Sequence, residues 1–170
     1  MHSDKLSFLH IQLGRMNRDD ITILVTASAS RFGDRNPQQL EQIASRIGKA
    51  EGAEVLQGLL KVFTDGEPAP LGSAAQEVSG RLLEELKPTG TLELKSLLRA
   101  ALPRYDLSVE QFPQYLAAIC GLSAVLSVFQ EIENELLTEV ERRALQTMKF
   151  WLRNIPAGDK QNAAQIPSAN

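Results

Sequence analysis

Five glutamates between residues 131 and 141 are the side chains in this sequence that most resemble a chemical site. They are Glu131, Glu133, Glu135, Glu139 and Glu141. In helical bundles, pairs of metal ions are bound by inward-facing Glu residues together with Glu-x-x-His motifs. The sequence contains two histidines, His2 and His10, and no Glu-x-x-His. We therefore interpret the glutamates as a charged helix flank in contact with solvent, and we predict neither a metal ion nor a cofactor.

His10 and Cys120 are the next candidates for chemistry. His10 lies between Leu9 and Ile11 and could act as a general base, because imidazole titrates near neutral pH. It has no evident nucleophile beside it to activate. Cys120 lies in an apolar segment, whereas reactive thiols need accessible, electropositive surroundings. We interpret both side chains as structural. A single cysteine also excludes an internal disulfide and any zinc site with two thiolates.

Short functional motifs give no further support for an enzyme. Residues 65–67 lack the alternating oxygen ligands of a calcium loop, and the glycines follow neither a dinucleotide-binding nor a phosphate-loop pattern. No G-x-S-x-G motif occurs. The alternative prediction is a small enzyme whose site is assembled from dispersed polar residues, namely His10, Asp34, Arg35 and Tyr105.

Aromatic and aliphatic side chains gather near the end of the last predicted helix. Phe150, Trp151, Leu152 and Ile155 lie beside Lys149 and Arg153. This group either closes the core or forms a binding hot spot, because Trp and Arg are enriched at the energetic centres of interfaces. Tyr105 and Tyr115 could contribute to the same surface.

The composition is that of a helical globular protein. Of the 170 residues, 43% are hydrophobic but only 5% are aromatic, so the core must consist mainly of aliphatic side chains, which favours helices over a β-sandwich. Residues 1–50 carry seven bases and five acids, and residues 51–170 carry eleven and sixteen. Seven scattered bases do not form the concentrated stripe of a nucleic-acid-binding protein. We therefore do not predict nucleic-acid binding, which would depend on Arg15, Arg18, Arg31 and Arg35 sharing one face.

The first thirty residues fit two structures. Leu6, Leu9, Leu13 and Met16 have helical spacing, but Ile21, Ile23 and Val25 also alternate as in a strand. We predict two helices, with an N-terminal β-hairpin as the alternative.

Helix signals are clearer in the middle of the chain. Asn36 and Pro37 predict a helix entrance, and Ser73 with Gln76 predicts a capping box. Glycines and prolines divide residues 36–103 into four apolar, helix-patterned segments, with a loop at 64–72.

Residues 107–156 contain the strongest helical pattern. Ser108 and Gln111 resemble a capping box, and Leu107 and Phe112 a hydrophobic staple. Pro113 predicts a slight kink or an early restart, and Gly121 predicts a break. A single long helix is then expected to continue to about Asn154. Its predicted buried stripe is Val125, Phe129, Ile132, Leu136, Val140, Ala144, Met148 and Trp151.

These patterns predict one all-α domain over residues 4–156, an irregular bundle of about six to eight helices, followed by a disordered tail at 157–170. The N-terminus lacks the pattern of a signal peptide, and the most apolar stretch, residues 112–129, is interrupted by Pro, Gly and polar residues. We therefore expect a cytoplasmic protein with no membrane span.

A non-enzymatic protein–protein interaction module is the predicted function: an adaptor, a regulator or an inhibitor or immunity-type partner. Its predicted contact surface is the acidic helix face with the aromatic end, formed by Glu131, Glu135, Glu139, Lys149, Trp151 and Arg153. The identity of the bound protein does not follow from the sequence. A homodimer is possible, because a long amphipathic helix can pair with a second copy.

Overall fold

Residues 15–155 are described by a computed structural model, and within this range they form eight helices and no strand. The helices are α2 (Arg18–Phe32), α3 (Pro37–Ile47), α4 (Gly52–Thr64), α5 (Ser73–Leu86), α6 (Leu94–Ala101), α7 (Gln111–Cys120), α8 (Leu122–Glu133) and α9 (Glu139–Arg153). The predicted all-α fold with a single compact domain is confirmed. The first predicted helix was marked by Leu6, Leu9, Leu13 and Met16; the first three of these lie outside the described residues, and Met16 precedes α2 without helical structure. The outer limits of the domain and the tail at 157–170 also lie outside the described residues.

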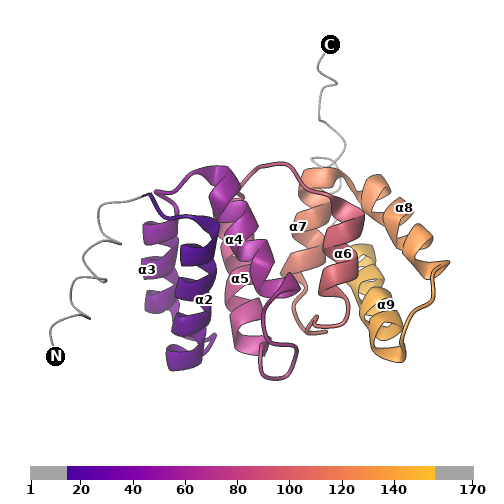
Figure 1. Cartoon of the computed structure of the whole chain (residues 1–170), viewed down its shortest axis with the longest axis horizontal. Helices are drawn as coiled ribbons and strands as arrows, with labels where there is room; N and C mark the ends of the chain where they lie inside the picture. The colour runs from indigo at the N-terminus through magenta and orange to yellow at the C-terminus, as the bar shows by residue number, and fades with distance from the viewer. Residues whose placement is uncertain (1–14, 156–170) are drawn as a thin grey trace, which may run out of the picture.

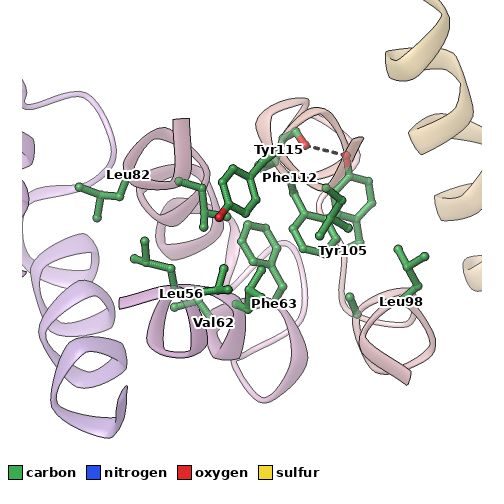
Figure 2. Close-up of a cluster of buried hydrophobic side chains, with 14 of the residues drawn as sticks. Leu56, Val62, Phe63, Leu82, Leu98, Tyr105, Phe112 and Tyr115 are labelled. Atoms are coloured by element: carbon green, nitrogen blue, oxygen red, sulfur yellow. Dashed lines mark hydrogen bonds between the residues drawn. The ribbon is translucent and has the colours of Figure 1, made fainter. Parts of the chain in front are cut away.

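The helices form two groups joined through one core (Figure 1). Helices α2 to α5 contact one another at one end of the molecule, and α7, α8 and α9 contact one another at the other. Contacts of α5 with α7 and of α4 with α6 join the groups. At the junction the rings of Phe63 and Phe112 stack, with 4.2 Å between their centroids and an 18° angle between their planes (Figure 2). The core is therefore continuous from α2 to α9.

The choice between a helix and a β-hairpin near the N-terminus is settled for residues 18–32. Residues 18–32, including the alternating Ile21, Ile23 and Val25, form α2, so a hairpin that uses them is wrong. Asn17 and Asp20 form a reciprocal capping box at the start of α2. A helix is favoured because it buries Ile21 and Val25 completely against the neighbouring helices.

A glycine allows α2 and α4 to approach closely. A Cβ atom at Gly58 would lie 2.7 Å from Cβ of Ile21 and 2.8 Å from the carbonyl oxygen of Arg18. The hydroxyl of Thr22 donates to the Gly58 carbonyl oxygen at 2.8 Å across the same crossing. Close backbone approach and an interhelical hydrogen bond thus replace side-chain interdigitation here.

One predicted helix entrance is confirmed and two are wrong. Asn36 caps α3, accepting from the backbone N–H of Gln39 at 3.3 Å. At α5 the cap is Gly72 rather than Ser73, and at α7 it is Glu110 rather than Ser108. The Ser108 hydroxyl instead donates to Oδ1 of Asp106 at 2.7 Å. A nearby carboxylate therefore competes successfully for the serine.

Gln76 is turned into the core instead of back towards the start of its helix. Its Nε2 donates to the Arg104 carbonyl oxygen, and its Oε1 accepts from the Asp106 backbone N–H, both at 2.8 Å. The side chain is completely buried. It satisfies backbone groups of the α6–α7 connection, which explains why no capping box forms at α5.

The segment that begins at residue 107 contains three helices, α7, α8 and α9, where a break at Gly121 and one long helix after it were predicted. Pro113 lies in the first turn of α7, where a missing N–H costs little, and the helix continues to Cys120. Gly121, with φ of 89°, then separates α7 from α8, and the two helices are bent by 116°. The break at Gly121 is confirmed.

The expected continuation from α8 to Asn154 is wrong. Helix α8 ends at Glu133, and Thr138 starts α9 through a capping box with Glu141. Leu136 and Val140, which were expected on the buried stripe, are 98% and 61% exposed. The capping box of Thr138 and Glu141 starts a new helix, so the apolar stripe of α8 does not continue through Leu136 and Val140.

Within residues 15–155, no single helix is long and apolar enough to cross a membrane. Helices α7 and α8 together reach the required length and composition, but only as a strongly bent pair.

Candidate interaction surface

The acidic face predicted on α8 and α9 is occupied by bases from α6. Lys95 Nζ lies 3.3 Å from Oε2 of Glu131 and 2.9 Å from Oε1 of Glu135. Arg99 reaches Oε2 of Glu135 through Nε and Oε1 of Glu141 through Nη1, both at 3.3 Å. The side-chain hydrogen bonds to the two glutamates raise the pKa of Lys95. These contacts connect α6 with both α8 and α9.

The two remaining glutamates are paired as well. Glu133 contacts Nζ of Lys149, which joins α8 to α9, and Glu139 accepts from Arg142 at 2.8 Å. All five acids therefore have a basic partner. The interpretation as a solvated flank is corrected accordingly: the side chains are mostly accessible, but their charge is balanced by neighbours. Exposed ion pairs of this kind contribute about 0–1 kcal/mol each.

Glu141 has a structural role that its sequence position does not indicate. Its Oε2 accepts from both the backbone N–H and the hydroxyl of Thr138, each at 2.8 Å. The Thr138 backbone hydrogen bond is the main reason that the pKa of Glu141 lies below its usual value, although partial desolvation opposes it. Glu141 thus holds the start of α9.

The predicted aromatic end is divided between the interior and the surface. Trp151 is half-buried, and its indole N–H donates to the Leu107 carbonyl oxygen at 3.0 Å. Leu152 is buried. Phe150 is 54% exposed and meets the Trp151 ring edge-on, with 5.2 Å between centroids. Trp151 and Leu152 therefore help to close the core, whereas the adjacent Phe150 lies at the surface.

Lys149 and Arg153, the two bases predicted at this end, differ in their surroundings. Lys149 is held by Glu133, with 22% of its side chain exposed. Arg153 is exposed at the last position of α9 and makes no ion pair within residues 15–155.

The two tyrosines are buried and are not available to the surface on which they were placed. The Tyr105 hydroxyl donates to the Val109 carbonyl oxygen at 2.7 Å (Figure 2), and Tyr115 donates to the Pro88 carbonyl oxygen. Burial raises the pKa of both phenols far above the ordinary value. Both rings are part of the core, and their hydroxyl groups bind the loops that contain Val109 and Pro88 to it.

Exposed apolar side chains concentrate where the predicted surface begins. Leu126 on α8, Leu136 in the connection, and Val140 and Phe150 on α9 are four of the seven large hydrophobic side chains exposed among the described residues. We call these four the α8–α9 apolar set. Leu136 and Val140 were not predicted at this surface, because their helical spacing placed them on the buried stripe. The Thr-x-x-Glu pattern of Thr138 and Glu141 was the signal that could have found them.

Only three of the four residues of the alternative enzyme site, Asp34, Arg35 and Tyr105, lie within the described part of the chain. Asp34 and Arg35 lie in the α2–α3 connection, whereas Tyr105 lies in the α6–α7 connection, where its buried hydroxyl donates to the Val109 carbonyl oxygen. Asp34 contributes a carbonyl oxygen that accepts from Arg81 at 2.8 Å. His10 lies outside the described residues. The described members therefore do not converge on one place.

The N-terminal arginines are not gathered either. Arg18 and Arg31 lie thirteen residues apart on α2, or about 20 Å along the helix. Arg18 is held by Glu54. Arg31 lies over the ring of Phe32, 5.0 Å from its centroid, and Arg35 is exposed beyond the helix.

Cys120 is half-buried at the end of α7, and desolvation raises the pKa of its thiol. Among the described residues, no three His, Cys, Asp or Glu side chains gather where they could hold a metal ion.

Comparison with known proteins gives no relative. No protein-family model, no curated protein and no solved structure matches the chain.

Proposed function

We propose that this chain is a non-enzymatic protein-binding domain, an adaptor, regulator or inhibitor-type partner, whose contact surface lies on α8 and α9. The observation that supports the proposal is the α8–α9 apolar set. Leu136, almost fully exposed, lies in the connection just before α9, Val140 lies at the start of that helix, and Phe150 lies near its end. Exposed apolar side chains are common singly, whereas a contiguous apolar patch marks an interaction site, and we propose that these side chains contribute to one such patch.

The contacts that α8 and α9 make with the rest of the domain hold the α8–α9 apolar set in a fixed position. Helix α9 is anchored by the Thr138–Glu141 capping box at its start and by the Trp151–Leu107 hydrogen bond near its end. The ion pairs of Lys95 and Arg99 hold α8 and α9 against α6. A surface of this kind loses little conformational freedom on binding. Glu131, Glu135 and Glu139 remain accessible at its border and are proposed to contribute to specificity, together with Lys149, Trp151 and Arg153.

Affinity capture with the full chain, combined with chemical cross-linking and mass spectrometry, tests the proposal. The informative variant is the double substitution Leu136→Ser and Phe150→Ser. The matched control is Ile23→Ser with Leu71→Ser, because those two side chains are exposed by 66% and 82% elsewhere on the molecule. We expect a captured protein to be cross-linked to α8 or α9, to be lost with the first variant and to be retained with the control.

Equal retention by both variants, or cross-links confined to α2–α5, would overturn the assignment of the surface. Light scattering on the same samples tests self-association. A dimer that dissociates in the first variant would identify a second copy of this chain as the bound protein.

A further inference from the structure

Within residues 15–155, the charged side chains of α9 that make no ion pair are basic, although the helix was predicted to present acids. Each of the five glutamates from 131 to 141 has a basic partner within the described residues. Lys95, Arg99, Arg142 and Lys149 supply those partners. Arg143 and Arg153 are both exposed and make no ion pair within residues 15–155.

The two unpaired arginines share one side of the helix with its exposed apolar residues. Arg143 follows Val140 by three residues, Phe150 follows Arg143 by seven, and Arg153 follows Phe150 by three. At 3.6 residues per turn, these four side chains lie within an arc of about 140° around the helix. We call these four residues the outer face of α9. The opposite side carries Ala144, Leu145, Met148 and Leu152, all buried. Glu139 and Gln146 are exposed within the same arc, and the carboxylate of Glu139 is paired with Arg142. The outer face therefore combines two guanidinium groups with two exposed apolar side chains, and the acid among them is already neutralised.

We propose that the outer face of α9 binds an acidic segment of another protein, one that also presents an apolar side chain to Phe150 and Val140. The inference rests on the proposed function and names the chemistry of the bound segment. Guanidinium groups bind carboxylates through paired hydrogen bonds, and they desolvate more readily than ammonium groups, so arginines suit an interface. Complementary charge selects the approaching segment, while the apolar contacts supply most of the affinity.

The dimensions of the face set the length of the segment. Arg143 and Arg153 are ten residues apart on α9, or about 15 Å along its axis. A helical segment of about three turns covers that distance. Nucleic acid is the less suitable occupant, because binding to its backbone uses many phosphate contacts, typically six or more, whereas this face offers two arginines between apolar side chains.

Trp151 provides a reporter for the test, because it is the only tryptophan in the chain and its ring meets that of Phe150. The probe is an 18-residue helical peptide of Glu, Ala and Leu without aromatic residues. The control probe has Lys in place of every Glu. Titration of the full chain is followed by Trp151 fluorescence and by amide chemical shifts in NMR spectra, at low and at physiological salt.

We expect the Glu peptide to shift amides of α9 and the Lys peptide to leave them unchanged. Binding should weaken with salt, and it should weaken about tenfold or more in the double variant Arg143→Glu and Arg153→Glu. The matched control, Arg35→Glu with Arg46→Glu, makes the same change of charge at two exposed arginines elsewhere and should change the affinity less than twofold. Circular dichroism establishes that both variants are folded.

Three results would overturn the inference: equal binding of the Lys peptide, equal weakening by the two double variants, or tighter binding of single-stranded DNA or phosphatidylserine vesicles than of the Glu peptide. Failure of the inference is distinguishable from failure of the proposed function. A captured protein that depends on Leu136 and Phe150 but not on Arg143 and Arg153 would support the function and overturn the acidic segment.

Discussion

The carboxylate of Glu54, on α4, caps the start of α2 and binds the first residue of that helix. Its Oε2 accepts from the backbone N–H of Arg18 at 2.7 Å, and its Oε1 accepts from the Arg18 guanidinium at 2.8 Å. One side chain thus satisfies an otherwise unpaired helix N–H and forms an ion pair. A second pair, between Lys61 and Asp19 at 2.6 Å, joins the same two helices.

The Glu54 contact predicts a pH dependence of stability. Hydrogen bonds from the Arg18 side chain, and then from its backbone, hold the pKa of Glu54 below the ordinary value. A group whose pKa is lowered in the folded state stabilises the protein above its unfolded pKa, and this contribution is lost as the pH falls through the folded pKa. We expect Glu54→Gln to lower the urea midpoint at pH 7 and to have progressively less effect below about pH 4. Urea unfolding of both proteins across this range is the measurement.

The matched control for that experiment is Glu41→Gln. Glu41 is exposed on α3 and makes no ion pair within residues 15–155. Its substitution should change the midpoint little at either pH. A Glu54→Gln effect that persists unchanged at low pH would show that the contact does not act through the charge of the carboxylate.

The glycine at the α2–α4 crossing predicts a steric penalty. Gly58→Ala places a methyl group 2.7 Å from Cβ of Ile21, and the carbonyl of Arg18 prevents easy relaxation. Overpacking of this kind costs about 1–3 kcal/mol, which exceeds the gain of about 1 kcal/mol that alanine brings to a helix. We expect a net loss of stability in urea unfolding. Gly52→Ala is the control, because its nearest neighbour would be 3.7 Å away, and it should be neutral or slightly stabilising.

Replacement of the buried Gln76 by an apolar residue is predicted to destabilise the protein, although apolar residues are usually favoured in a core. Gln76→Met keeps a similar volume but leaves the Arg104 carbonyl oxygen and the Asp106 N–H without that partner. An unsatisfied buried group costs about 1–3 kcal/mol. We expect a loss of stability in this range, with faster hydrogen exchange at Asp106. An exchange rate at Asp106 equal to that of the parent protein would contradict the assigned role.

The start of α9 predicts a moderate loss when its cap is removed. In Thr138→Ala the N–H of Glu141 loses its acceptor, and Glu141 loses one of its donors. Removal of an N-cap side chain costs about 0.5–2 kcal/mol. Thr147→Ala on the same helix is the control, because its hydroxyl bonds only to a carbonyl oxygen one turn earlier. Thermal unfolding of the two variants, compared with the parent, should separate them clearly.

The sequence by itself determined the class of structure and most of the core. Apolar spacing along α3, α4, α5 and α6 is a local property, and it predicted those helices because an amphipathic helix needs only its own residues to define a face. Asn36 with Pro37 and the break at Gly121 were predicted for the same reason. The capping boxes expected at Ser73 and Ser108 did not form, because Gln76 binds backbone groups of Arg104 and Asp106 and the Ser108 hydroxyl binds the Asp106 carboxylate.

Only the tertiary structure decided what the surface of α8 and α9 presents. In the sequence, Glu131 to Glu141 form an acidic run, because Lys95 and Arg99, which pair with Glu131, Glu135 and Glu141, are more than thirty residues away. Folding brings α6 beside α8, so those charges are balanced and the arginines of the outer face are left. Likewise Trp151 turns inward to the Leu107 carbonyl oxygen and Phe150 outward, although they are adjacent in sequence. Ion pairing and burial depend on which residues are neighbours in space, and those neighbours are distant in the sequence.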